Sequence, residues 1–304
     1  MPAGRGEFRI LDEQKKQKII DLVFGKNGLQ VGLVKMFLDP WHQDSPGGEF
    51  DHTITTANMR EFVRRGLEKT QQRDASLEIV TTLYAPPAWA TQQKFLRGRD
   101  LDPGMKDELA DYMIKWIKFL KEEEGFPVKY LSLHNEGEDW KRWPKDGSDG
   151  NIYSSKVNGL IPWAGIQRPE QWVGGDPNPG CAIQVYEDGS YEVMRGYYFY
   201  KQVTRAGQPD MAVSRTSSMD AMTAIIAFAS NGTENPNAFV VINTSVETRP
   251  LNIDIKGTDG KTFKAYRTNK ENERHEDIGI FKADEKQQLF YEAPKGSVTT
   301  FYEK

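Results

Sequence analysis

The sequence predicts an α/β protein in which a parallel sheet with covering helices precedes an antiparallel β-sandwich. Two observations predict this class. Helical stripes alternate with short buried strands through the first half of the 304 residues, whereas short alternating strands separated by turns fill the last third. The character of the chain changes after Gly207-Gln-Pro209, so we expect a first domain at 1–207 and a second at 208–304.

The elements of the first domain follow from apolar spacing. The segment 12–24 carries Ile19, Ile20, Val23 and Phe24 on one helical stripe, and Gly25 ends it. Continuing along the chain, the pattern predicts strand 29–38, helix 56–72, strand 77–84, helix 103–124 and strand 128–133. It then predicts strand 157–167, a hairpin at 181–194 that turns at Asp188-Gly189, and helix 197–205. This order is typical of βαβ units.

The second domain is predicted from period-two alternation and turn residues. Strands are expected at 221–230, 238–245, 251–256, 262–267, 289–293 and 297–302. Turns are expected at Asn231-Gly232, Thr258-Asp-Gly260 and Pro294-Lys-Gly296. Antiparallel strands of this length and spacing are typical of a β-sandwich.

Composition excludes several classes of function. The net charge of −4 comes from nearly balanced charges without a basic stripe, so we expect no nucleic-acid partner. No apolar run is long enough to span a membrane, and the amino terminus has no signal-peptide pattern. The four histidines lack metal-ligand spacing, and the single Cys181 excludes an internal disulfide. We therefore expect neither a metal nor a cofactor, and no membrane partner.

Polar and aromatic groups follow three of the predicted strands. They are Asp39-Pro-Trp41-His42, Tyr84-Ala-Pro-Pro-Ala-Trp89 and His134-Asn135-Glu136. In a (β/α) barrel the carboxyl ends of the strands converge on one face, where catalytic groups lie. A Glu at such a tip can serve as general acid and base, and Trp and Tyr rings suit sugar faces. The plainer interpretation is a polar strand end leading into a surface loop, with the Trp residues in the core.

The run LYAPPAWA, the helix DELADYMIKWIKFLKEEEG and the strand VKYLSLHNEGE resemble the third and fourth barrel strands of glycoside hydrolase family 30. The Pro-Pro-x-Trp motif of that family stands here as Ala85-Pro86-Pro87-Ala88-Trp89, and its Asn-Glu-Pro motif as Asn135-Glu136-Gly137. The segment 160–163 with 197–202 resembles the eighth strand and last helix. The resemblance implies a (β/α)₈ TIM-type barrel, incomplete in this sequence, followed by the β-sandwich that this family carries.

The resemblance also implies roles for individual residues. Glu136 would be the general acid/base, Asn135 would bind the sugar 2-hydroxyl, and Trp163 would form the floor of the subsite. The remaining candidates for the sugar pocket are Trp89, Tyr84, Asp39, Trp41, His42 and His134. Core packing is a competing interpretation for Trp89 and Trp163.

The chain departs from the family pattern in three ways. No strand precedes the first helix, and Lys35 replaces an expected Arg. Only 25 residues (161 − 136) separate Glu136 from Ile161, where the fifth to seventh strands should lie, so no nucleophile is identifiable. Either the sequence joins parts of a complete enzyme, with an internal gap near 149–157, or it is a short protein with a reduced sheet.

The leading hypothesis is a retaining O-glycoside hydrolase acting on a β-linked neutral poly- or oligosaccharide. A carbohydrate-binding, catalytically inactive module and a scaffold whose sandwich mediates contacts are the two rival hypotheses. By the family resemblance the protein is expected to be secreted or periplasmic.

Overall fold

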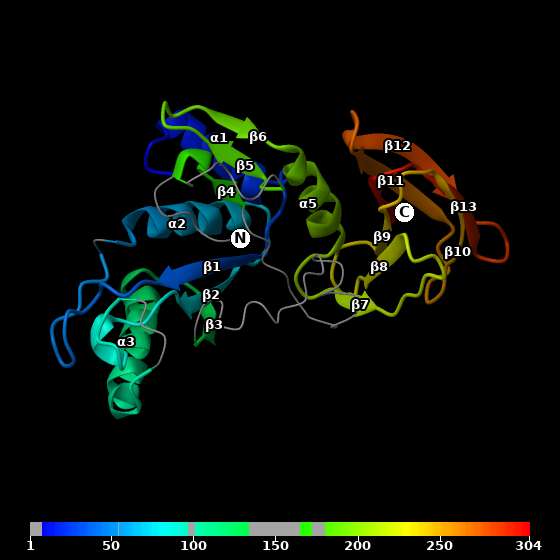
Figure 1. The fold of residues 1–304 in the computed structure, drawn as a ribbon. Coiled ribbons are helices and arrows are strands. Elements are labelled where there is room, and N and C mark those ends of the chain that lie inside the picture. Colours follow the sequence, from blue (N-terminus) through cyan, green and yellow to red (C-terminus); the bar gives the residue numbers. More distant parts are fainter. Residues whose placement is uncertain (1–7, 54, 97–100, 134–164, 172–179) are drawn as a thin grey trace.

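The structure is a computed structural model that describes residues 8–53, 55–96, 101–133, 165–171 and 180–304. Figure 1 shows helices and short sheets in the amino-terminal part, and antiparallel sheets in the carboxy-terminal part, with helix α5 (Arg195–Ala206) between them. This helix ends at Ala206, and the domain boundary expected at residue 207 stays a prediction.

A three-stranded parallel sheet organises the first part. Its strands are β1 (Leu33–Leu38), β2 (Glu78–Leu83) and β3 (Val128–Ser132), in that order. The register pairs Leu38 with Leu83 and Thr82 with Ser132, so all three strands end at one edge. Within the described residues this sheet is open, and it contains three of the strands that a barrel would need.

Helices α1 (Glu13–Phe24) and α2 (Ala57–Gln71) pack on this sheet (Figure 1). The Asp12 carboxylate caps α1 by accepting a hydrogen bond from the Lys15 amide at 2.8 Å. The two helices approach closely at Gly66, where a Cβ atom would lie 2.7 Å from the Phe24 ring. Glycine in mid-helix costs about 1 kcal/mol relative to alanine, and the close contact explains its use here.

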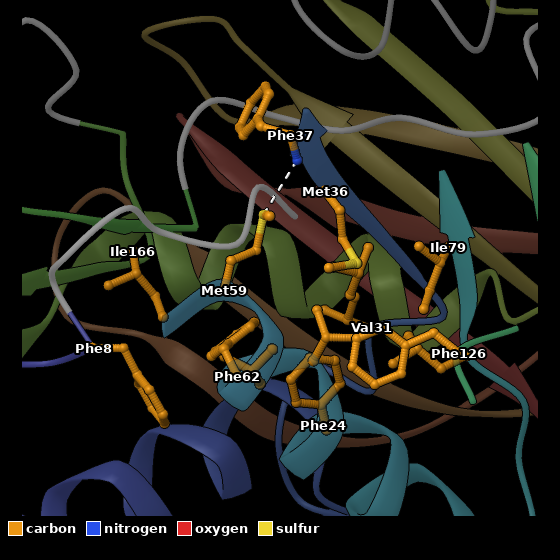
Figure 2. Close-up of a cluster of buried hydrophobic side chains, with 14 of the residues drawn as sticks. Phe8, Phe24, Val31, Met36, Phe37, Met59, Phe62, Ile79, Phe126 and Ile166 are labelled. Atoms are coloured by element: carbon orange, nitrogen blue, oxygen red, sulfur yellow. Dashed lines mark hydrogen bonds between the residues drawn. The ribbon is translucent and has the colours of Figure 1, made fainter. Parts of the chain in front are cut away.

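The sheet and these helices enclose one hydrophobic core. Figure 2 shows Phe24, Phe62, Val31 and Ile79 gathered between the helices and the strands. In the same view the Phe37 amide faces the Met59 sulfur atom, with which it forms a 3.2 Å hydrogen bond. Burial of these side chains supplies the main driving force for this part of the fold, at roughly 25 cal/mol per Å² of apolar surface.

Two predicted elements of this part differ from the structure. Strand β1 begins at Leu33 rather than at residue 29, because Leu29 and Val31 donate backbone hydrogen bonds back to the end of α1. The single helix predicted at 103–124 has three segments: a 3₁₀ turn at Pro103–Met105, α3 (Lys106–Lys118) and a π-helical turn, η3 (Phe119–Glu123). The predicted apolar face of this helix is confirmed, since Tyr112, Met113, Trp116 and Leu120 are buried.

A small second sheet follows the part of the chain at 134–164. It comprises β4 (Ile166–Gln167), β5 (Ile183–Val185) and β6 (Tyr191–Val193). Strands β5 and β6 form the predicted hairpin, with Gly189 at φ +75° in its turn. Only the last residues of the strand predicted at 157–167 are described, as β4, and the gap expected near 149–157 lies outside the described residues.

The carboxy-terminal part is antiparallel, as predicted. A six-stranded sheet has the order β12-β11-β14-β9-β8-β7, and β10 pairs with β13 in a separate two-stranded sheet. The strands are β7 (Ala212–Ser214), β8 (Thr223–Ala229), β9 (Ala238–Asn243), β10 (Arg249–Asp254), β11 (Thr262–Asn269), β12 (Arg274–Lys282), β13 (Gln288–Ala293) and β14 (Ser297–Glu303). Side chains of both sheets share one core, which includes Phe263, Leu289 and Phe301.

Strands β7 and β12 are present in the structure but were not predicted from the sequence. β12 carries five charged or His residues among nine, and all nine are exposed or half-buried at the sheet edge, so its sequence shows no apolar alternation. Charged residues on an edge strand discourage pairing with another chain. β7 is three exposed residues long, and its one partner among the described strands is β8.

Candidate functional site

Two of the three predicted strand tips lie together at the carboxyl edge of the parallel sheet. Asp39 directly follows β1 and Tyr84 directly follows β2, and the Tyr84 amide donates to the Leu38 carbonyl at 2.8 Å. Strand β3 ends at the same edge and leads toward His134-Asn135-Glu136. These three residues and Trp163 lie outside the described residues, so their proposed roles stay predictions.

Asp39 is held by its own loop. Its Oδ1 atom accepts from the Trp41 amide at 3.2 Å and lies 3.3 Å from the Nε2 atom of His42. Burial tends to raise the pKa of this carboxyl, but hydrogen bonds from His42 and Thr55 outweigh that effect and leave the pKa below its usual value. Asp39 therefore carries a buried negative charge that hydrogen bonds within its own loop stabilise.

The side chain of His42 turns inward to meet a second histidine. Its Nδ1 atom lies 2.7 Å from Nδ1 of His52, so one of these nitrogens must donate and the other accept. Both rings pack against Trp116, and the His42 amide donates to the Tyr112 hydroxyl at 3.2 Å. Burial, followed by the charge of His42, lowers the pKa of His52 to about 4. This network fixes the loop after β1 to helix α3.

The aromatic candidates differ in how much of each ring is accessible. Trp41 is 49% exposed, and Tyr84 is half-buried with its ring edge against Phe37 at 5.3 Å. Trp89 is half-buried because its Nε1 atom donates to the Gln43 carbonyl at 3.1 Å and its ring meets Tyr112. Trp41 and Tyr84 thus offer ring surface at the strand tips, whereas Asp39 and His42 are almost wholly buried and support the loop.

Sequence reasoning missed His52 and Tyr112 as partners of these tips. Tyr112 lies on the predicted apolar stripe of the helix, and its hydroxyl donates to the Asp39 carbonyl while it accepts from His42. The only available signal was a phenol within an otherwise apolar stripe. His52 lies in a loop ten residues after His42, and no periodic pattern connects the two.

A hollow of about 820 Å³ lies away from the strand tips. Its lining includes Gln30 and Ser76, which precede β1 and β2, together with Gln208 and Glu234 from the second part. This hollow is therefore at the amino-terminal edge of the parallel sheet. Among the described residues no group of three or more His, Cys, Asp or Glu could hold a metal ion. The described helices include none that is both long and apolar enough to cross a membrane.

No protein-family model and no curated protein sequence matches the chain. Solved structures do match it. The catalytic domain of GH30 xylanase C from Talaromyces cellulolyticus aligns with a TM-score of 0.65 at 11% identity, over 100% of this chain and 95% of that one. The endo-β1,6-glucanase BT3312 aligns with a TM-score of 0.66 at 12% identity, over 99% and 89% of the two chains.

A third structure, described as a conserved exported protein from Bacteroides fragilis, aligns with a TM-score of 0.63 at 14% identity, over 99% of this chain and 96% of that one. The chain thus has a fold similar to that of family 30 glycoside hydrolases, as the sequence motifs predicted. At these identities the likeness concerns the fold.

Proposed function

We propose that the protein is a retaining glycoside hydrolase that cleaves a β-linked neutral polysaccharide or oligosaccharide. The observation that carries the proposal is the family 30-like fold, together with the position of Asn135-Glu136 in the sequence shortly after strand β3. In the same proposal the parallel sheet belongs to a (β/α)₈-type barrel and the carboxy-terminal sheets form the accompanying β-sandwich.

Glu136 is the general acid/base in the proposed mechanism. It protonates the glycosidic oxygen as the bond to the anomeric carbon breaks, and then removes a proton from the water that releases the sugar. Asn135 binds the 2-hydroxyl, and Trp163 forms the floor of the subsite. A second carboxylate about 5–5.5 Å from Glu136 must act as nucleophile in a retaining enzyme, and no residue of this sequence is assigned to it.

The substrate class rests on the strand tips and on the similar structures. The exposed Trp41 follows the end of β1 and the half-buried Tyr84 follows the end of β2, at the same edge of the sheet as the end of β3, and aromatic rings there favour stacking on sugar rings. The matching structures include a xylanase and an endo-β1,6-glucanase, so β-linked xylan and β-1,6-glucan are the first substrates to test. The likeness to an exported protein supports a location outside the cytoplasm.

The proposal is tested with Glu136→Gln, and Glu138→Gln serves as a matched control two residues away. Release of reducing ends from each polysaccharide is expected to fall by roughly 10²–10⁴-fold in Glu136→Gln, because general acid catalysis is lost. Glu138→Gln is expected to stay within about twofold of the parent. Equal activity of Glu136→Gln and the parent would eliminate Glu136 as the acid/base.

The alternative function is carbohydrate binding without hydrolysis. It is favoured by the lack of an identifiable nucleophile, since only 25 residues (161 − 136) separate Glu136 from Ile161, where further strands of a complete enzyme should lie. It predicts that the unmodified protein binds a β-glycan in calorimetry, that it releases no product from it, and that Glu136→Gln changes neither result.

A further inference from the structure

Helix α5 places two cations against the six-stranded sheet, and neither forms an ion pair within the described part of the chain. Lys201 and Arg205 lie one turn apart on the stripe that also carries Tyr198 and Gln202. This stripe faces the sheet, because the Gln202 amide group bonds the Thr268 hydroxyl at 3.0 Å and the Thr268 hydroxyl bonds the Tyr198 carbonyl. No carboxylate of the described residues lies within ion-pair distance of Lys201 or Arg205.

Opposite these cations, the sheet presents a cluster of rings. The His275 and Tyr266 rings are stacked with centroids 4.8 Å apart, and Tyr302 meets Tyr266 edge-on at 6.0 Å. His275 is the extra residue of a β-bulge between β11 and β12 and has a φ of +63°. Such bulges redirect a side chain, and a left-handed histidine is an unusual and costly backbone choice.

Two polar atoms of this cluster, Nε2 of His275 and the hydroxyl of Tyr302, are buried and have no hydrogen-bond partner among the residues that the structure describes. A buried polar group that makes no hydrogen bond costs about 1–3 kcal/mol. Burial, together with the charges of Lys201 and Arg205, lowers the pKa of His275 to about 4, so its ring is neutral at pH 7. Burial and then the charge of Arg205 lower the pKa of Lys201.

We propose that Lys201, Arg205, His275 and Tyr302 form a binding site for a small oxyanion of the phosphate, sulfate or carboxylate class. The site combines two positive charges with a phenol O–H and a neutral imidazole, whose Nε2 atom donates to an anionic oxygen in the tautomer that carries the proton on Nε2. A water molecule would satisfy the two neutral atoms but would leave both positive charges uncompensated. An oxyanion satisfies the neutral atoms and compensates the charges together.

This site lies on the carboxy-terminal sheet and is independent of the strand tips of the proposed hydrolase. Its occupation would tie α5 to β12 and β14, because the donors come from all three elements.

The test is calorimetric titration and thermal unfolding with inorganic phosphate, and in parallel with acetate, against sodium chloride at matched ionic strength. The variants are Lys201→Gln and Arg205→Gln, and the control is Lys256→Gln, which removes an exposed cation elsewhere in the second part. At about ten times its Kd, phosphate is expected to raise the Tm of the parent and of the control by about 3 °C. The shift is expected to disappear in both test variants.

A second readout protects the test against misfolding. In anion-free buffer of low salt, Lys201→Gln is expected to have a higher Tm than the parent, because it removes a desolvated cation and its repulsion by Arg205. A phosphate shift with no acetate shift assigns the site to tetrahedral anions, and shifts with both extend it to carboxylates. A parent Tm that phosphate raises no more than chloride does, or equal phosphate shifts in all three variants, overturns the proposal.

Discussion

The His42–His52 pair makes the stability of the amino-terminal part depend on pH, and His52→Gln tests this dependence. The pKa of His52 falls from 6.5 to about 4 on folding. As the pH is lowered, the unfolded chain therefore binds a proton before the folded chain does. The contribution of neutral His52 to the free energy of unfolding is therefore complete above pH 6.5 and is lost as the pH falls from 6.5 to about 4.

The magnitude follows from this shift. At pH 5.0 the unfolded-state pKa lies 1.5 units above the pH, whereas the folded-state pKa still lies below it. At about 1.36 kcal/mol per unit the free energy of unfolding falls by about 2 kcal/mol between pH 7.5 and 5.0, or about 1–2 kcal/mol once solvent screening is allowed for. Asp39 adds nothing in this interval, because its pKa lies below the ordinary value of 3.8.

Urea unfolding monitored by tryptophan fluorescence isolates this effect. All seven tryptophans precede residue 173, so the signal reports the amino-terminal part. Between pH 7.5 and 5.0 the free energy of unfolding of His52→Gln is expected to fall by about 1–2 kcal/mol less than that of the parent protein. His275→Gln is a matched control, because His275 also has a pKa of about 4 but lies on β12, far along the chain from any tryptophan. Equal losses in His52→Gln and the parent would refute the reasoning.

Two further changes probe the packing of the same part. Gly66→Ala is expected to lower the free energy of unfolding by about 1–2 kcal/mol, because the new methyl group meets the Phe24 ring at 2.7 Å and overpacking outweighs the helix propensity gained. Urea titration measures this loss. If adding Phe24→Leu to the Gly66→Ala variant restored none of the lost stability, the steric cause would be contradicted. Glu124→Gln is expected to cost about 2–4 kcal/mol, because the largely buried carboxylate binds both Arg60 and Arg64. Burial tends to raise the pKa of Glu124, yet the two arginines lower it below its ordinary value. The stability lost in Glu124→Gln should therefore shrink at pH 3, where the carboxyl begins to be protonated. An equal loss of stability at pH 7 and pH 3 would argue against the ion pairs.

Local pattern was sufficient for most elements of the fold. Apolar periodicity predicted α1, α2 and α5 nearly to their ends, because each has a buried face and a clear stop, and the Asp188-Gly189 turn predicted the hairpin of β5 and β6. The motif residues around Trp89 and Glu136 pointed to the family 30-like fold that the solved structures then matched. β12 was missed because an edge strand with charged side chains has no buried face to produce alternation.

The contacts of the candidate site were decided by tertiary structure. Asp39, His42 and Trp41 were identified as one strand tip, but which of them faces solvent depends on His52 and Tyr112, which are brought in by another loop and by helix α3. The same holds for His275, which lies 70 or more residues after Lys201 and Arg205 in the sequence and comes near them where α5 packs on the bulged strand. The sequence determined which segments have an apolar face, since that is a local property of side-chain order. Charge pairing and burial arise only when distant segments pack, so the fold alone decided them.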